Sequence, residues 1–340
     1  MDLETMLPEW VVEKVVHYGP GDLVKNGLPH FGFHDRTGKH YAIFHQKHFL
    51  GLMGEDDRLE WTVAAHQVFQ GTPNIVAKLN YPMYVDNLSD KTLLVSNFGD
   101  ARIYHIDVRK MKAELFVEGS KIGMKDTGNC VVDDEGSFWV NEVEGCRIWK
   151  FDSKGNPVLT LGDGTPGFQQ GTVNFGEAKF SWIYDIRRGP DGNIYVLDSR
   201  NFAVRLIDLK NRKVKTITGT GKPGYEGDGG NALTATFGSD PTARFDGPIS
   251  LSLDEEGNIF VGDRQNHVVR MIQKKSHTIT TIAGNHHSVK GKDNNLEEQD
   301  PLRLNLPEIS SMDYYDGHLF VPTDLSPETG DLAVLRKTKY

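Results

Sequence analysis

The sequence predicts an all-β fold, a six-bladed β-propeller built from four-stranded antiparallel blades. Three observations carry this prediction: an excess of glycine, a repeated strand–turn–strand pattern, and an unpaired strand pattern near the N-terminus. Glycine accounts for 36 of the 340 residues, above the usual share of about 7%. A chain of this length exceeds the size of one ordinary hydrophobic core, and radial repetition of small sheets resolves that difficulty.

The repeat runs along most of the chain with a period of roughly 50 residues. Each copy holds a strand pattern that ends near a valine, a polar turn, and a second alternating strand. The four clearest copies are TLLVSNFGDARIYHID (92–107), SFWVNEVEGCRIWKFD (137–152), NIYVLDSRNFAVRLID (193–208) and NIFVGDRQNHVVRMIQ (258–273). Two weaker copies, at 30–54 and 307–324, complete a set of six. Six units of this size indicate six blades.

We expect the whole chain, residues 1–340, to form a single propeller domain. The blades are predicted at approximately 30–66, 81–118, 127–161, 182–219, 247–284 and 307–338. The last unit is one strand short, whereas residues 10–16 (WVVEKVV) precede the first blade and have a strand pattern. The N-terminal strand is therefore predicted to complete the last blade and to close the ring.

The charge of the chain limits its partners. There are 47 acidic and 38 basic residues, and the formal net charge is -9. Nucleic acids and anionic membranes are bound by clustered positive charge, so we expect neither as a partner. The first sixteen residues lack the basic start and apolar core of a secretory signal, and the two cysteines cannot form a disulfide framework. These features favour a cytoplasmic protein.

The units resemble NHL repeats. The likeness is closest in GNIYVLDSRNFAVRLID (192–208) and GNIFVGDRQNHVVRMI (257–272), and GTGKPGYEGDGGNALTATF (219–237) resembles the glycine-rich linker between NHL units. The resemblance extends over roughly residues 28–338 and implies the propeller fold. It implies less about function, because NHL propellers include protein and RNA binders, lyases and lactonase-like metal enzymes.

In a propeller the innermost strands all begin on one face of the central channel. His30 and Glu308 follow prolines at the predicted starts of the first and last inner strands, so closure of the ring would make them neighbours. A histidine beside a carboxylate is suited to general acid–base catalysis. His45, in the turn of the first blade, is the next catalytic candidate. The alternative is that His30 and Glu308 only form hydrogen bonds with strand ends.

A metal site is the third interpretation of the same face. Glu308, with His30, would then ligate a divalent ion (Ca, Mg or Zn). Oxygen ligands would come from other blades, for which the candidates are Asp126, Asn129, Asp185 and Asp246. No nucleotide or redox cofactor is expected, because the glycine-rich segments GDGTPG (162–167) and GTGKPG (219–224) do not fit the phosphate-loop pattern and lead into no helix.

Long connections and aromatic residues suggest walls for a pocket. Residues 162–181, 219–247 and 284–307 are long for strand connections and are expected on the channel-mouth side. Four aromatic residues are candidates for substrate binding: Tyr84, Trp182, Tyr184 and Phe245. A pocket with aromatic walls and few polar groups suits a small molecule. Alternatively, these rings pack adjacent blades together.

Some polar residues recur in every clear repeat and are therefore predicted to serve the blades. The third strands carry Arg102, Arg147, Arg205 and Arg270, which we expect to pair with nearby turn acids. Asp198 and Asp263 occupy equivalent positions at the ends of second strands. Side chains of this type commonly cap turns, so we expect a structural role for both.

Two hypotheses about function follow. The first is an enzyme, a lyase or hydrolase, that binds a small molecule at the channel mouth and uses His30 and Glu308 for proton transfer. The second is a non-catalytic propeller whose rim binds a protein or a peptide. No sequence motif identifies a substrate.

Overall fold

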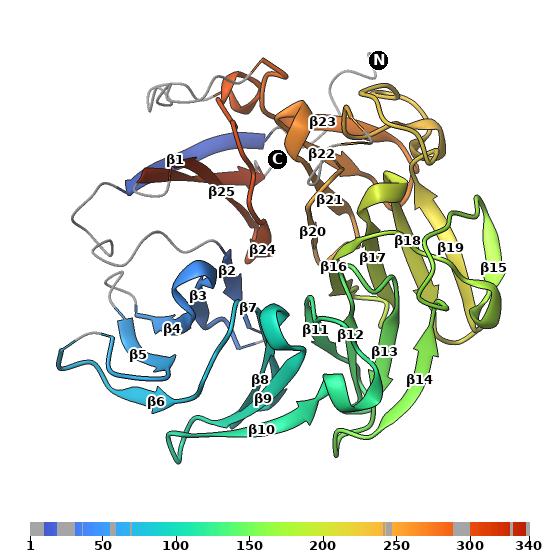
Figure 1. The fold of residues 1–340 in the computed structure, drawn as a ribbon. Coiled ribbons are helices and arrows are strands. Elements are labelled where there is room, and N and C mark those ends of the chain that lie inside the picture. The colour runs from blue at the N-terminus through green and yellow to red at the C-terminus, as the bar shows by residue number, and fades with distance from the viewer. Residues whose placement is uncertain are drawn as a thin grey trace.

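A computed structural model shows six sheets arranged around a central axis, which confirms the predicted six-bladed propeller (Figure 1). It describes residues 10–18, 31–35, 37–54, 59–68, 70–240, 242, 247–287, 300–326 and 329–337. The innermost strands β2, β7, β11, β16, β20 and β24 surround the axis in chain order.

The four main strands of each blade run from the inner to the outer edge in antiparallel steps. Blade one contains β2 (Phe31–His34), β3 (His40–Phe44), β4 (Phe49–Met53), β5 (Leu59–Ala64) and β6 (Asn74–Val76). Blade two contains β7 (Pro82–Ser89), β8 (Thr92–Asn97), β9 (Arg102–Asp107) and β10 (Lys112–Glu118). Blade three contains β11 (Cys130–Val132), β12 (Phe138–Asn141), β13 (Ile148–Phe151) and β14 (Pro157–Leu161).

The second half of the ring repeats this plan. Blade four contains β15 (Thr172–Asn174), β16 (Ile183–Arg188), β17 (Ile194–Asp198), β18 (Ala203–Asp208) and β19 (Lys213–Thr218). Blade five contains β20 (Ser250–Leu253), β21 (Ile259–Asp263), β22 (Val268–Ile272) and β23 (Ile279–Ala283). Blade six contains β24 (Asp313–Tyr315), β25 (His318–Ser326), β26 (Thr329–Lys337) and β1 (Trp10–Tyr18).

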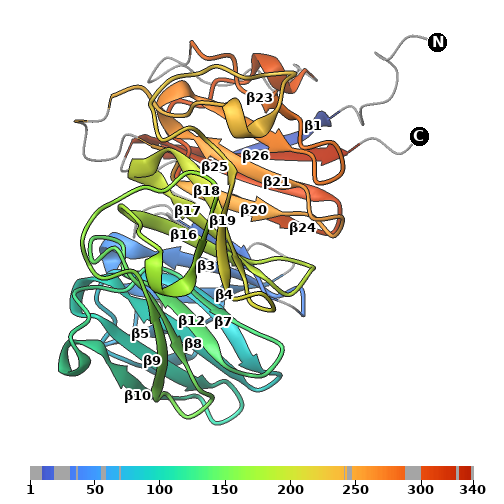
Figure 2. The same ribbon diagram turned by 90° about the vertical axis from the view of Figure 1, so that its right-hand side faces the viewer.

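The ring closes through the N-terminal strand, as predicted. Strand β1 pairs antiparallel with β26, from Trp10 opposite Lys337 to Tyr18 opposite Gly330. Figures 1 and 2 show β1 beside the C-terminal strands of blade six. Trp10 is buried and its ring lies edge-on to that of Phe260 in blade five, with the centroids 5.4 Å apart. The closing strand therefore contributes both backbone pairing and core packing.

Two blades have a fifth strand, where the sequence pattern predicted four. In blade four, β15 pairs antiparallel with the outer strand β19, from Thr172 opposite Lys215 to Asn174 opposite Lys213. In blade one, β6 pairs parallel with β5. Both extra strands lie in long connections, which are long enough to fold back and cover an exposed sheet edge.

The core lies between the blades. Strand β17 is buried at all five positions, because neighbouring blades cover both of its faces. The outer strand β19 alternates between half-buried and buried residues instead, since one of its faces is more open. The helices of the described residues are single 3-10 turns, and none is long and apolar enough to cross a membrane.

Glycine is required where outer strands end. Gly219 follows β19 with a φ of +95°, and a Cβ atom there would lie 2.1 Å from the Phe202 carbonyl oxygen. Gly284 follows β23 with a φ of +87°, and a Cβ atom would lie 2.1 Å from the His267 carbonyl oxygen. Only glycine combines a left-handed backbone with so close an approach. The junction between an outer strand and the following turn thus requires glycine in at least two blades, which explains part of the glycine excess.

Candidate functional site at the channel mouth

The channel-mouth face is formed by the starts of the inner strands and by the turns between second and third strands. Four of these turns contain a 3-10 helix followed by a residue in the left-handed conformation: His48 (φ 59°), Ala101 (φ 52°), Phe202 (φ 47°) and His267 (φ 58°). The recurrence of this geometry shows that the blades present equivalent turn positions on the same face. Different side chains at these positions distinguish one blade from another.

Glu308 lies on this face in partnership with an arginine. Its Oε2 atom is 2.8 Å from Nη2 of Arg264, and the two side chains are 24% and 23% exposed. Arg264 begins the turn of blade five, so the pair connects the last two blades. His30, the partner expected for Glu308, lies outside the described residues. Among the described residues, Glu308 forms its ion pair with Arg264.

The inner strand of blade six begins later than the sequence indicated. Strand β24 starts at Asp313, five residues after Glu308. Before it, Ile309 forms an isolated bridge with Thr323 of β25, and both residues are buried. Glu308 therefore belongs to a short approach segment next to the turn of blade five, and not to the inner strand itself.

His45 joins blades one and two. Its Nδ1 atom is 3.0 Å from the carbonyl oxygen of Pro82 at the start of β7. A carbonyl oxygen only accepts, so Nδ1 carries the proton in this contact. The neighbouring His48 accepts a hydrogen bond from the backbone N–H of Tyr81 at 3.0 Å. The structure thus places His45 at a blade junction on the mouth face.

Trp182 is held in a strained conformation beside a cation. It directly precedes β16, has a φ of 54°, and has the Arg200 guanidinium 4.3 Å from its ring centroid. Tyr81 precedes β7 in the equivalent position with a φ of 52°. Bulky residues adopt this conformation rarely, at a cost of roughly 1–3 kcal/mol, and such strain is concentrated at functional sites. Phe245, the other expected aromatic wall, lies outside the described residues.

Side chains fill the channel below the mouth. On β16, Nε of Arg187 is 3.1 Å from Oδ1 of Asp185, and the two residues are 6% and 3% exposed. Arg187 lies four residues along the strand from Ile183, or about 13 Å at the usual rise. A ligand that enters from the mouth therefore meets a charged floor within the ring.

The Asp185–Arg187 pair is joined to every other blade. Arg187 donates to the Tyr84 hydroxyl of blade two at 2.6 Å and to the Met312 carbonyl of blade six at 3.5 Å. The Phe33 ring of blade one lies 4.8 Å from the guanidinium. Asp185 accepts two hydrogen bonds, one from the Asn129 amide of blade three and one, at 3.0 Å, from the Leu251 N–H of blade five.

The two tyrosines considered as pocket walls have packing or hydrogen-bond contacts within the ring. Tyr84 is 8% exposed and its hydroxyl is bonded to Arg187, so it belongs to the filled part of the channel. Burial raises the pKa of its phenol far above the ordinary range. Tyr184 is partly buried against the apolar cluster shared by blades four and five.

The metal-ligand candidates have separate roles. Asp126 accepts the backbone N–H groups of Val143 and Glu144, at 2.5 and 3.1 Å, and so fixes the turn of blade three. Asn129 donates to Asp185, and Glu308 pairs with Arg264. Asp246 lies outside the described residues. Within the described ranges no group of three or more His, Cys, Asp or Glu side chains is arranged to hold a metal ion.

Asp126 is one of the acidic groups of this face whose pKa is raised by burial. It is 6% exposed, and burial raises the pKa of its carboxyl to about 6. The two hydrogen bonds that it accepts from backbone N–H groups lower its pKa, but the loss of solvation on burial raises the pKa by more. Its protonation therefore changes near neutral pH.

The recurrent arginines bind acids and linkers, in agreement with the structural role predicted for them. Three of them pair with an acid of their own turn: Arg102 with Asp100 at 3.3 Å, Arg147 with Glu142 at 2.5 Å, and Arg205 with Asp198 at 3.2 Å. The fourth, Arg270, pairs instead with Asp228 of the glycine-rich linker at 2.7 Å.

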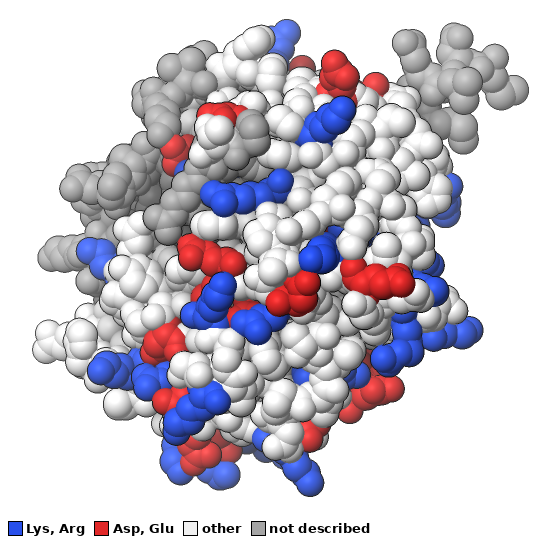
Figure 3. All heavy atoms as spheres, turned by 45° about the vertical axis from the view of Figure 1, so that its right-hand side comes forward, with Lys and Arg blue, Asp and Glu red and all other residues white. Residues whose placement is uncertain are grey.

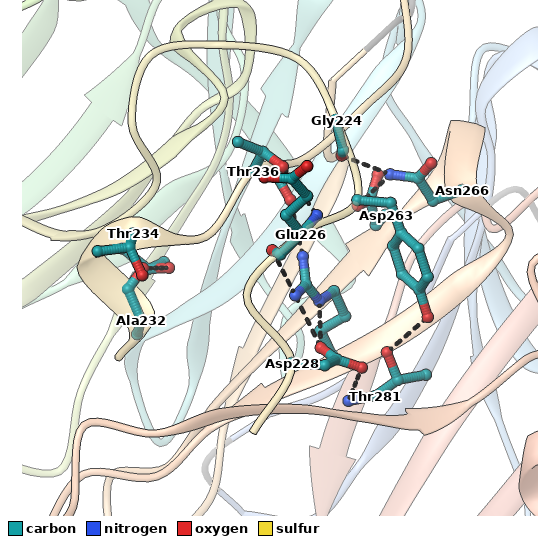
Figure 4. Close-up of polar contacts among 12 residues, drawn as sticks. Gly224, Glu226, Asp228, Ala232, Thr234, Thr236, Asp263, Asn266 and Thr281 are labelled. Atoms are coloured by element: carbon teal, nitrogen blue, oxygen red, sulfur yellow. Dashed lines mark hydrogen bonds and ion pairs between the residues drawn. The ribbon is translucent and has the colours of Figure 1, made fainter. Parts of the chain in front are cut away.

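Arg270 holds the linker before blade five in place. Figure 4 shows Glu226, Asp228 and Thr236 of this linker close to Thr281 of the blade. The Arg270 side chain, which is fully buried, donates to the carbonyl oxygens of Thr236 and Glu226 at 2.7 and 3.0 Å. The other carboxylate oxygen of Asp228 accepts the backbone N–H of Thr281 at 3.0 Å. The linker is thus fastened to the third and fourth strands of its blade.

Asp198 and Asp263 also fix connections, although by different contacts from those expected. Neither caps its own 3-10 turn through a backbone hydrogen bond. Asp198 accepts the backbone N–H of Ser181 at 2.7 Å, and Asp263 accepts that of Gly238 at 2.9 Å. Both donors lie in the connections that lead into the inner strands, so these carboxylates join one turn to the entry of its blade.

Acidic and basic side chains alternate over the face shown in Figure 3. Ion pairs on the surface of the described residues include Lys179 with Asp163 at 2.9 Å and Lys274 with Asp191 at 3.2 Å. Exposed pairs of this kind contribute little to stability.

Comparison with known proteins agrees with the resemblance to NHL repeats. No family model matches the chain. The NHL repeat-containing protein 2 of Bos taurus is 31% identical over 99 residues, which cover 28% of this chain and 13% of that protein. The chloroplastic protein SUPPRESSOR OF QUENCHING 1 of Arabidopsis thaliana is 26% identical over 141 residues, which cover 39% of this chain and 12% of that protein. The matches span about an eighth of each relative.

Solved structures share the fold at low sequence identity. A Bacteroides thetaiotaomicron protein of unknown function has a TM-score of 0.64 and 14% identity, and covers 96% of this chain and 76% of its own. An auxiliary nutrient binding protein of the same organism has a TM-score of 0.61 with the same identity and coverage. Virginiamycin B lyase of Staphylococcus aureus has a TM-score of 0.56 and 13% identity, and the match covers 97% of this chain and 100% of the lyase. Propellers of this shape thus include both a lyase and a binding protein.

Proposed function

We propose that the protein binds a small organic molecule at the channel mouth and converts it by an elimination or a hydrolysis. One observation carries the proposal: three consecutive blades bring an aromatic–cation pair, Trp182 with Arg200, and an ion pair, Arg264 with Glu308, to the same face. An apolar surface with a few convergent charged groups is the usual composition of a small-molecule site.

The residues divide into binding and proton-transfer roles. Trp182, which is held in place by its backbone conformation, offers a flat surface to an apolar part of the ligand. Glu308, whose carboxylate is paired with the guanidinium of Arg264, acts as the proton acceptor. In an elimination it takes a proton from carbon, and the electrons of the C–H bond expel the leaving group. In a hydrolysis it takes a proton from the attacking water.

The filled channel restricts where the ligand lies. Arg187 and Asp185 occupy the interior with little exposure, so the proposed site is a shallow one on the mouth side of this pair. Arg264 is then the cation nearest to Glu308 and stabilises negative charge that develops on the substrate. A binding protein or peptide at the rim is the alternative function, and it would use the same exposed turns without a proton acceptor.

Affinity selection tests the binding part of the proposal. The protein is incubated with a mixture of lactones, aryl esters and cyclic depsipeptides of the streptogramin B type, and retained compounds are identified by mass spectrometry. We expect the Trp182→Ala variant to lose the compounds that the wild type retains. Leu115→Ala is the matched control, because Leu115 is 46% exposed on an outer strand away from the mouth. Equal retention by Trp182→Ala and wild type would contradict the proposed site.

A further inference from the structure

A cavity of about 680 Å³ lies between blades one and two. Its walls come from the turn of blade one, the segment that follows β5, the approach to β7, and the turn of blade two. None of the mouth residues Trp182, Arg264 and Glu308 lines it. We call it the inter-blade pocket. Its volume falls within the range of roughly 300–1,000 Å³ that is usual for small-molecule sites.

The inter-blade pocket is positively charged in a protein whose net charge is -9. Three cationic side chains, Lys47, Lys78 and Arg102, line it together with a single acid, Asp100. Arg102 is already bound to Asp100 at 3.3 Å and lies 3.6 Å from Glu118. The ammonium groups of Lys47 and Lys78 form no ion pair with any part of the chain that the structure describes. Two positive charges thus remain for a ligand.

The floor of the inter-blade pocket is apolar. Phe49, Ala64 and Leu79 line it and are each at most 5% exposed. Phe49 stacks on Phe44 at 4.2 Å within a small apolar cluster of blade one, which gives the floor a rigid base. An apolar floor below two ammonium groups that have no ion-pair partner among the described residues fits a ligand with an apolar body and an anionic end.

His48 adds a hydrogen-bond donor to the wall. Its Nδ1 atom accepts the backbone N–H of Tyr81 at 3.0 Å, so in the neutral ring the proton is carried by Nε2. The left-handed backbone of His48, with a φ of 59°, holds the ring in this position. The wall therefore offers an N–H donor at Nε2 of His48 in addition to the two lysine side chains.

We propose that the inter-blade pocket binds a small organic anion with an apolar body. Lys47 and Lys78 hold its carboxylate or phosphate group, and Phe49, Ala64 and Leu79 contact its apolar part. The site is separate from the channel mouth, so the proposal does not depend on turnover at Glu308.

Fluorescence titration with 8-anilinonaphthalene-1-sulfonate tests this proposal on the full chain. The probe is an apolar anion, and N-phenyl-1-naphthylamine is its neutral counterpart. We expect the Lys47→Glu/Lys78→Glu variant to raise the Kd for the anionic probe at least tenfold and that for the neutral probe less than twofold. The control variant Lys91→Glu/Lys154→Glu makes the same change of charge at exposed turns outside the pocket and should leave both Kd values within twofold.

A second variant tests the location independently of charge. Ala65 lines the inter-blade pocket and is exposed, so Ala65→Trp fills the space without disturbing the core. We expect it to abolish binding of both probes while the circular dichroism spectrum stays unchanged. Competition by octanoate or by hexyl phosphate then identifies a carboxylate or a phosphate as the preferred group. Unchanged binding of the anionic probe by either pocket variant, or no binding by the wild type, would overturn the proposal.

Discussion

The guanidinium of Arg187 and the carboxylate of Asp185 form an ion pair on the inner strand of blade four, with Nε and Oδ1 3.1 Å apart. Through side-chain and backbone contacts the pair is connected to all six blades. Both groups are almost fully buried. Such a pair at the axis ties the ring together, and it also limits any ligand to the mouth side of the channel.

Breaking this pair should destabilise the whole ring. We expect Arg187→Met to lower the free energy of unfolding by about 3–5 kcal/mol, because it leaves the Asp185 carboxylate buried without its cation. Arg188→Met is the matched control on the same strand, since Arg188 pairs with the exposed Asp134 and should contribute less than about 1 kcal/mol. Urea denaturation of both variants measures the difference. Equal effects would show that the axial pair has no special role.

Ring closure should depend on Trp10. This side chain is 7% exposed and packs against Phe260 of the neighbouring blade. We expect Trp10→Ala to cost about 3–5 kcal/mol, the usual penalty for removing a buried large aromatic ring. Val11, half-buried on the same strand, is the control and should cost less than about 1 kcal/mol when changed to Ala. Thermal unfolding followed by circular dichroism distinguishes the two, and similar melting temperatures would contradict the closure role.

Asp126 should make stability depend on pH. Its pKa is raised from 3.8 to about 6 in the folded protein, so between about pH 4 and 6 the folded state keeps a proton that the unfolded state has released. Stability contributed by this group is therefore lost as the pH rises through that window, by an amount on the order of 2 kcal/mol.

The Asp126→Asn variant isolates this contribution, because the amide does not titrate. We expect its free energy of unfolding, relative to that of the wild type, to rise by about 2 kcal/mol between pH 4 and 7. Urea denaturation at several pH values provides the comparison, and other buried acids cancel in the difference. Parallel pH profiles would show that burial does not perturb this carboxyl.

Gly219 should be intolerant of any side chain. Gly219→Ala forces a Cβ atom toward the Phe202 carbonyl oxygen and imposes left-handed strain, so we expect a loss of at least about 2 kcal/mol. Gly176→Ala serves as the control, because a Cβ atom there meets nothing within 4 Å. Its effect should stay within about 1 kcal/mol of zero. Chemical denaturation of both variants tests whether the strand–turn junction requires glycine.

The fold could be predicted from the sequence, because the same strand–turn–strand pattern recurs in each repeat. Equivalent valines, polar turns and alternating strands locate the blades, and the missing strand of the last blade points to residues 10–16. The extra strands β6 and β15 were not predicted, because three-residue segments such as Thr172–Asn174 carry too little periodicity to stand out from a loop.

The site was harder to predict from the sequence, because its contacts join residues that are far apart in the chain. The sequence selected Glu308, and its pairing with His30 stays a prediction because His30 lies outside the described residues. The ion pair of Glu308 with Arg264, 44 residues away in a turn, could not be predicted from the sequence. Sequence reasoning missed Arg187, although an Asp–x–Arg pattern on an inner strand places Asp185 and Arg187 on one face. It also missed Lys47 and Lys78, since ordinary surface lysines carry no signal of a shared pocket.

The most direct test of the proposed function is the rate at which Glu308→Gln converts a compound that the wild type retains and transforms. The change preserves the shape of the side chain but removes its ability to accept a proton, and Glu135→Gln, at an 80% exposed side chain, is the control. We expect Glu308→Gln to retain the compound and to form product at least 100-fold more slowly, within the usual contribution of acid–base catalysis of about 10²–10⁴. Conversion by Glu308→Gln at the wild-type rate would contradict the assignment of the proton acceptor.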